Sequence, residues 1–131
     1  MVPMRDIEAF ALRIAAEYKP QRIILFGSYA YGQPTEDSDV DILAVFPGRG
    51  TAVDKALDIR VRMHPGYPLD LLTRTTEEVR RRLAMQDWFM REIVEQGKVL
   101  YDASRSRVDR QSGRRLRSRA TRDARTKVSR A

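Results

Sequence analysis

The sequence predicts an α/β (α+β) fold in which a small mixed β-sheet is flanked by helices. Short apolar runs that are typical of strands occur at residues 21–26, 38–46 and 68–73. The segments before, between and after these runs place apolar residues at helical spacing, and Gly or Pro residues separate the two kinds of segment. This alternation favours strands covered by helices over an all-helical or all-strand domain.

The first predicted element is an amphipathic helix that starts near Pro3 and ends before Pro20. Its apolar positions recur every three or four residues. They are Ile7, Phe10, Ala11, Ile14, Ala15 and Tyr18. The run at 22–26 is apolar after its first residue, which favours a strand buried on both faces, and Gly27 ends it. Residues 28–37 are mostly polar and predict one helical turn followed by a loop.

Residues 38–46 alternate in polarity and predict a strand with acidic residues at one end. One predicted face carries Val40, Ile42, Ala44 and Phe46, and the other carries Asp39, Asp41, Leu43 and Val45. A Pro-Gly turn at 47–50 follows, and residues 51–63 predict a helix. We expect this helix to turn four apolar residues inward. They are Val53, Ala56, Leu57 and Val61.

The last third of the folded part predicts a strand, two helices and an edge strand. Residues 64–68 break the preceding helix, and residues 69–72 form a short strand in which Asp70 and Leu72 share a face. Thr75 and Glu78 have capping-box spacing and open a helix. The helix after it carries Phe89, Ile93 and Val94 and ends at Gly97, and 99–101 is the edge strand. We interpret Trp88, Phe89 and Met90 as core or partner-facing surface rather than a base-stacking site.

Composition and charge limit the possible domain organisation and location of the protein. The length of 131 residues fits one domain, predicted at 1–102, and a basic tail at 103–131 that we expect to be disordered or loosely helical. The tail holds 11 Lys+Arg and 2 Asp, whereas residues 1–102 are nearly neutral. No apolar run approaches the roughly 20 residues that span a bilayer, so we expect no membrane contact and a cytoplasmic location.

The residue types also limit the chemistry. The chain has no cysteine and its single histidine is His64, which excludes thiolate catalysis and zinc sites built from Cys or several His. Any bound metal must therefore be held mainly by oxygen.

One constellation of residues points to phosphate chemistry. Asp39 and Asp41 lie two residues apart on a strand, so their carboxylates project from one face and can converge on a hard cation. Asp70 is the best candidate for a third carboxylate, because it sits in a short apolar strand where an unpaired carboxylate would otherwise be costly. The alternative is that Asp70 pairs with an arginine such as Arg74. Gly27 and Ser28 follow a buried strand, where backbone N–H groups and a hydroxyl can bind an anion. Together they suit a triphosphate held at one end and bound to metal at the other.

The spacing of these residues is similar to a known signature. Gly27-Ser28, then ten residues, then Asp39-x-Asp41 resembles the DNA polymerase β-like nucleotidyltransferase superfamily over residues 4–102. The chain looks most like the minimal nucleotidyltransferase (MNT) antitoxins of HEPN-MNT toxin-antitoxin pairs. Tyr31 departs from the pattern, because many relatives carry Arg there.

The resemblance implies a polymerase β-like fold and a specific reaction. It implies that Asp39, Asp41 and Asp70 bind two Mg²⁺ ions, that Gly27 and Ser28 bind the nucleotide, and that ATP is the AMP donor. The acceptor it implies is a tyrosine hydroxyl of a partner HEPN ribonuclease toxin, which the chain would disable as its antitoxin.

Two further functions remain open from the sequence. The domain could be catalytically silent and only mask the toxin. It could also add nucleotides to RNA, with the basic tail at 103–131 binding nucleic acid through phosphate attraction.

Overall fold

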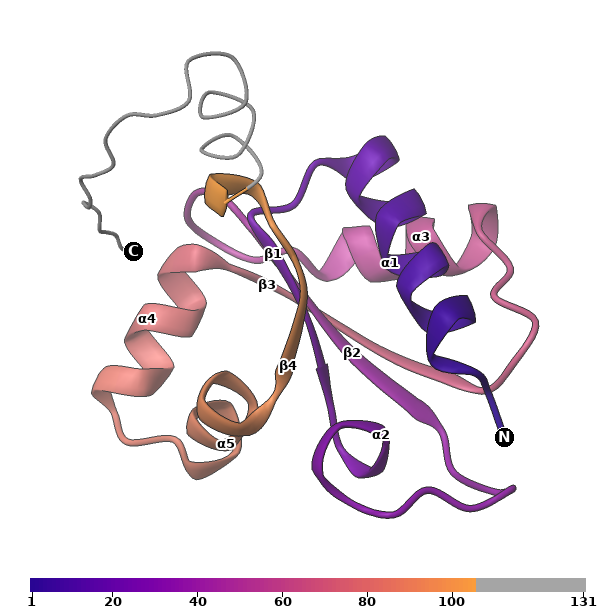
Figure 1. Ribbon diagram of the computed structural model, residues 1–131. Helices are drawn as coiled ribbons and strands as arrows, with labels where there is room; N and C mark the ends of the chain where they lie inside the picture. Colours follow the sequence, from indigo (N-terminus) through magenta and orange to yellow (C-terminus); the bar gives the residue numbers. More distant parts are fainter. Residues whose placement is uncertain (106–131) are drawn as a thin grey trace, which may run out of the picture.

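Four strands form one mixed sheet in the computed structural model, which describes residues 1–105 (Figure 1). The strand order is β3-β2-β1-β4. Strand β2 runs parallel to β3 and antiparallel to β1, and β4 runs antiparallel to β1. This arrangement confirms the predicted mixed sheet flanked by helices. The elements are α1 (Met4–Tyr18), β1 (Arg22–Phe26), α2 (Ser28–Tyr31), β2 (Val40–Phe46), α3 (Val53–Arg62), β3 (Leu69–Thr75), α4 (Thr76–Ala84), α5 (Trp88–Gln96) and β4 (Lys98–Asp102).

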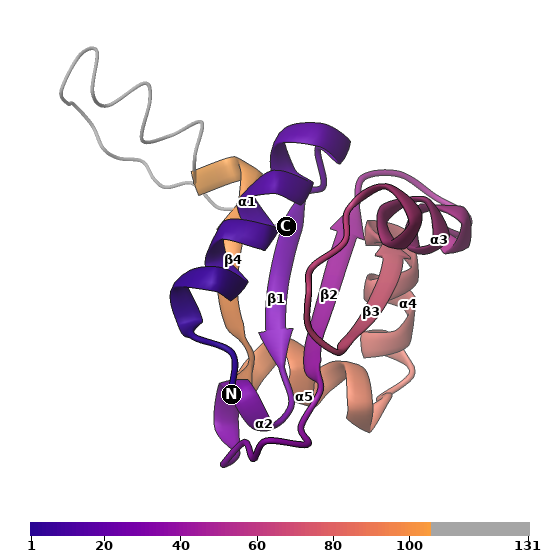
Figure 2. The ribbon, with the colours of Figure 1, turned by 90° about the vertical axis from the view of Figure 1, so that its right-hand side faces the viewer.

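Helices cover both faces of this sheet (Figures 1 and 2). Helices α1 and α3 pack on one face, where Ile14 and Ile59 contact the same core as Ile42 of β2. Helices α4 and α5 pack on the other face, where Val79 and Ile93 share a second core with the sheet. Because both faces are covered, β1 and β2 are buried along almost their whole length. The sheet is therefore the middle of three layers.

Alternation along β2 agrees with the sequence prediction. One face of β2 joins the core under α1 and α3, and it consists of Val40, Ile42, Ala44 and Phe46. Leu43 and Val45 join the core under α4 and α5. The same alternation in β3 places Leu71 under α1 and α3 and Leu72 under α4 and α5.

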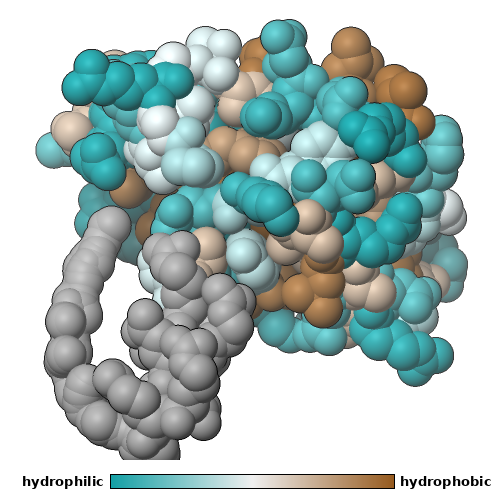
Figure 3. Space-filling view, turned by 90° about the horizontal axis from the view of Figure 1, so that it is seen from above, coloured by the Kyte–Doolittle hydropathy of each residue, from teal (hydrophilic) through white to brown (hydrophobic). Residues whose placement is uncertain are grey.

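The predicted buried face of α3 was wrong for three of its four residues. Val53, Leu57 and Val61 are 65%, 67% and 62% exposed, and the view from above shows apolar patches among hydrophilic side chains (Figure 3). A second stripe faces the sheet instead. It consists of Ala52, Ala56, Ile59 and Met63, of which only Ala56 was predicted.

The two stripes of α3 have nearly the same helical spacing, so periodicity alone did not separate them. The Thr73 side chain donates a 2.6 Å hydrogen bond to the Ala52 carbonyl, which fixes the start of the helix over the sheet. Small residues at 52 and 56 let the helix approach closely, and Ile59 is then completely buried.

The predicted start of α4 and the predicted end of α5 are confirmed. The amide of Glu78 donates to the Thr75 hydroxyl at 3.2 Å, and the Thr75 amide donates to the Glu78 carboxylate at 2.8 Å, which completes a capping box. Gly97 ends α5, and a Cβ at this position would overlap the Ile93 carbonyl and the Ile24 side chain. Gly97 thus allows the end of α5 to lie directly against β1.

None of the helices in residues 1–105 has the length and apolar character needed to cross a bilayer. Most of the predicted tail at 103–131 lies outside the described residues, so its predicted disorder and nucleic-acid binding stay predictions.

Candidate active site

Two of the three predicted carboxylates lie side by side at one edge of the sheet. Asp41 in β2 and Asp70 in β3 are direct partners in the parallel register. Asp39 precedes β2 by one residue and is exposed, as is Asp70, whereas Asp41 is half-buried. The strands therefore bring together the acids that the sequence placed on separate elements.

Burial and the neighbouring acids change the chemistry of Asp41. Its pKa is raised from the ordinary 3.8 to about 6, first by burial and then by the negative charges of Asp70 and Asp39. A hydrogen bond between the Asp41 and Asp70 side chains adds to this shift. Three carboxylates in such proximity repel one another, so the site favours a proton or a cation among them.

Gly27 and Ser28 lie at the same edge, directly beside Asp41. Phe26, the last residue of β1, is the register partner of Asp41, and the chain turns at Gly27 with φ of 74°. A Cβ at Gly27 would overlap the Asp41 carboxylate oxygen Oδ2. Only glycine therefore allows both this backbone conformation and this close approach.

Helix α2 begins at Ser28 and continues the turn for four residues. The amides of Ala30 and Tyr31 both donate to the Gly27 carbonyl at 3.0 Å. The preceding amides, at Ser28 and Tyr29, stand at the helix start, where no earlier helical carbonyl can accept them. These amides and the Ser28 hydroxyl are the groups of this turn that can hold phosphate oxygens.

The acids offer the donor set that Mg²⁺ prefers, because all three supply carboxylate oxygens. In residues 1–105 no three His, Asp or Glu side chains already converge closely enough to hold an ion. The strand register nevertheless places Asp41 directly opposite Asp70, and Asp39 lies two residues before Asp41. Asp39 and Asp70 are exposed side chains that can rotate toward a cation, so the residues fit a magnesium site.

Asp70 was predicted as the third carboxylate for a reason that the structure contradicts. We expected a carboxylate in a short apolar strand to be buried, but Asp70 is exposed because it lies at the open end of β3. The alternative partner Arg74 instead donates to the Thr73 carbonyl at 2.8 Å. The register opposite Asp41, rather than burial, is what places Asp70 in the site.

The sequence interpretation gave the site no residues from α5. The structure places Phe89 edge-to-face with Phe26, with ring centroids 5.7 Å apart and an interplanar angle of 83°. Phe89 is 52% exposed, Trp88 is 85% exposed and Met90 is buried. Because Phe26 precedes Gly27, Phe89 borders the predicted phosphate-binding turn. The sequence feature that could have indicated this contact is the adjacent pair Trp88 and Phe89. Their spacing along the chain alone did not link them to Gly27.

A separate hollow on the surface contains none of these residues. It lies between α4 and α5 and is lined by Arg81, Arg82, Met85 and Asp87. The Arg82 guanidinium donates to the Asp87 carboxylate at 2.9 Å, so this hollow is partly closed by an ion pair. Its residues support the link between the two helices, and we assign it no ligand.

Comparison with known proteins agrees with this geometry. Residues 7–101 match the model of the nucleotidyltransferase domain family. A relative from Methanocaldococcus jannaschii, named "Putative protein adenylyltransferase", is 32% identical over 102 residues, which cover 74% of this chain and 96% of that protein.

Solved structures show the same fold at lower identity. A "putative nucleotidyltransferase" from Sulfolobus solfataricus is 20% identical with a TM-score of 0.55, over 76% of this chain and 80% of that one. A toxin-antitoxin structure with AMP-PNP is 22% identical with a TM-score of 0.50, over 82% of this chain and 91% of that one. The fold and the family match lead to one conclusion: the chain belongs to the nucleotidyltransferase domain family and is a nucleotidyltransferase enzyme.

Proposed function

We propose that the enzyme transfers AMP from ATP to a hydroxyl of a partner protein, a tyrosine of a HEPN ribonuclease toxin, and so acts as its antitoxin. The observation that carries the proposal is the alignment of Asp41 with Asp70 beside the Gly27 turn. Support for protein adenylylation comes from the name of the 32% identical relative. Support for a toxin partner and an adenine nucleotide comes from the toxin-antitoxin structure with AMP-PNP.

In this proposal Asp39, Asp41 and Asp70 hold the metal. Asp39 and Asp41 would bind two Mg²⁺ ions, and Asp70 would complete the coordination of one of them. Bound Mg²⁺ supplies charge neutralisation and lowers the pKa of a hydroxyl. The carboxylates themselves fix where this positive charge lies relative to the Gly27 turn.

The bond changes follow from the same placement. The hydroxyl oxygen of the acceptor forms a bond to the α-phosphorus of ATP, and the bond from that phosphorus to the bridging oxygen breaks. Asp70 accepts the hydroxyl proton, and pyrophosphate leaves toward the amides and hydroxyl at Gly27 and Ser28. Alignment and charge neutralisation then supply most of the rate, because the proposed step forms no covalent intermediate with a side chain of the enzyme itself.

The open position of the site suits an acceptor on another molecule. Asp39 and Asp70 are both exposed, so a tyrosine side chain from a partner can reach them without a change in the fold. Tyr31, where many relatives carry Arg, is 37% exposed at the end of α2 and leaves this side of the site without that positive charge.

The test is transfer of AMP from labelled ATP, with Mg²⁺, to a co-expressed HEPN toxin, read as a mass increase of the intact toxin. Wild type should label the toxin, and Asp39→Ala should not. Asp37→Ala is the matched control, because Asp37 is an exposed acid of the preceding loop, outside the proposed site. Equal labelling by Asp39→Ala would disprove the assigned site.

The same samples distinguish the proposed enzyme from a catalytically silent domain that only masks the toxin. If that alternative holds, Asp41→Ala co-purifies with the toxin and neutralises it as well as wild type does, without any label on the toxin. Our proposal expects neutralisation to fall together with labelling.

A further inference from the structure

The first turn of α5 places two aromatic side chains at the surface near the candidate active site. Trp88 and Phe89 are 85% and 52% exposed, whereas Met90 is buried. The turn itself is held firmly, because the Asp87 carboxylate accepts the Met90 amide at 3.0 Å and the Arg82 guanidinium at 2.9 Å. The exposure of these rings is therefore a property of an ordered helix start.

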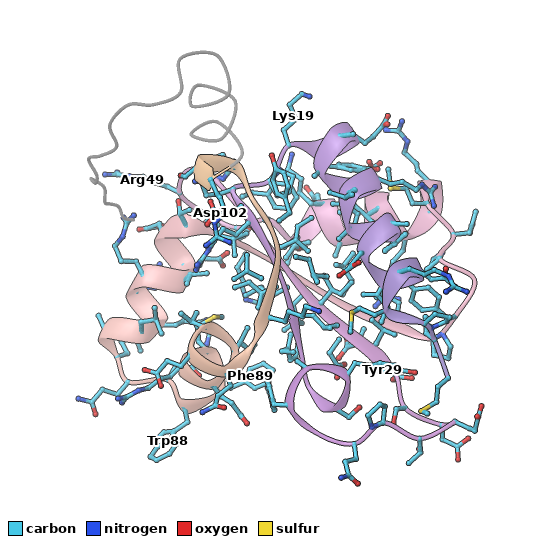
Figure 4. The ribbon with its side chains drawn as sticks, viewed as in Figure 1. Lys19, Tyr29, Arg49, Trp88, Phe89 and Asp102 are labelled. Carbon is cyan, nitrogen blue, oxygen red and sulfur yellow. The ribbon has the colours of Figure 1, made fainter. Side chains whose placement is uncertain are left out.

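Only one of the two rings lies toward the active site. Phe89 lies between α5 and α2, whereas Trp88 points outward from α5 (Figure 4). Phe89 is in edge-to-face contact with Phe26, the register partner of Asp41. Phe26, Leu43 and Val45 share the core under α4 and α5. Asp41 lies two residues before Leu43 in β2, so it projects from this same face. Phe89 and the acids thus border one space.

The position of Phe89 within this space indicates which of the two substrates it lies near, the nucleotide donor or the hydroxyl acceptor. In phosphoryl transfer the attacking and leaving oxygens lie roughly in line. Pyrophosphate leaves toward Gly27 and Ser28 at the end of β1, so the acceptor approaches from the side of Asp70 in β3. Helix α5 packs over β1, and Phe89 contacts its last residue. Phe89 is therefore on the donor side, away from the incoming hydroxyl.

We propose that the exposed surface of the Phe89 ring holds the nucleobase of the donor nucleotide by stacking. The assignment rests on the proposed function, because it requires a nucleoside triphosphate at Gly27 and Ser28. It reverses our interpretation of Phe89 from sequence, which favoured core or partner-facing surface. Every base presents a π-face to an aromatic ring, so Phe89 contributes affinity for the base without selecting which base is bound.

The contact with Phe26 makes Phe89 suitable for this role. An edge-to-face contact at 5.7 Å fixes the ring plane and still leaves 52% of the residue exposed. The ring thus loses little conformational freedom when a base binds, which favours binding.

The experiment compares two ligands and three variants of the full chain by isothermal titration calorimetry with Mg²⁺. The ligands are ATP and inorganic tripolyphosphate, which lacks the nucleoside. Phe89→Leu removes the ring but keeps an apolar side chain against Phe26, and Phe89→Tyr keeps the ring. Trp88→Ala is the matched aromatic control, because Trp88 points away from α2 and contributes nothing to the core.

We expect Phe89→Leu to weaken ATP binding about tenfold and to leave tripolyphosphate binding unchanged. Phe89→Tyr and Trp88→Ala should bind both ligands as wild type does. Unchanged ATP affinity in Phe89→Leu, or an equal loss in Trp88→Ala, would overturn the assignment of the base to Phe89 while leaving the proposed transfer intact. Failure of wild type to bind either ligand would overturn the proposed function as well.

Discussion

The substitution Asp41→Asn should stabilise the metal-free protein above pH 6. The pKa of Asp41 in the folded protein, about 6, is higher than the ordinary 3.8 that applies to the unfolded chain. The folded state therefore binds the proton more tightly, and the free energy of unfolding falls as the pH rises from about 4 to about 6. Asparagine is neutral at every pH and is not subject to this loss.

The size of the effect follows from the two pKa values. Their difference corresponds to at most about 3 kcal/mol. Because Asp41 is only half-buried, solvent screens part of this energy, and we expect about 1.5 kcal/mol. For a domain of this size that is roughly 5 to 10 °C in melting temperature.

Thermal unfolding of wild type and Asp41→Asn, in EDTA between pH 4 and pH 8, measures this difference directly. The two melting temperatures should nearly agree at pH 4 and separate by pH 7, with the variant higher. Excess Mg²⁺ should raise the melting temperature of wild type at pH 8 and have a smaller effect on the variant. A difference that is the same at every pH would refute the argument, because an effect of the Asp41 charge must disappear when Asp41 is protonated.

Four other substitutions test the packing that positions the site. Gly27→Ala should cost about 1 to 3 kcal/mol of stability in urea unfolding, because of the φ of 74°, and should reduce AMP transfer by displacing the Asp41 carboxylate. Ile59→Ala should cost about 2 to 5 kcal/mol and Leu57→Ala less than about 0.5 kcal/mol, and equal costs would contradict the observed face of α3. Thr75→Ala removes the capping box and should cost about 1 kcal/mol, measured by the same unfolding transition.

Much of the fold could be predicted because local signals agreed with burial. The apolar run that ends at Phe26 is a strand buried on both faces, and Thr75 with Glu78 forms the expected capping box. The face of α3 could not be predicted, because two apolar stripes shared the helical period. Val53 and Leu57 are larger than Ala52 and Ala56, but the small residues let the helix lie closer to the sheet.

The candidate site was predictable where its residues are near in sequence and less so where they are distant. The Asp39-x-Asp41 spacing on a strand is visible from alternation alone, as is the glycine that ends the preceding strand. The alignment of Asp41 with Asp70 is set by parallel pairing across a connection that contains α3, which no local pattern specifies. The approach of Phe89 to Phe26 likewise depends on how α5 packs over β1.

The parallel ladder between β2 and β3 has a consequence for how such enzymes diversify. Backbone pairing fixes Asp41 opposite Asp70, and a slip of one residue would move Asp70 to the opposite face of the sheet. The helical connection between the strands carries none of the proposed catalytic groups, and its outer surface is free of the core. Mutations on the outside of α3 can therefore accumulate and alter which surfaces the enzyme recognises, while the spacing of its acids stays constant.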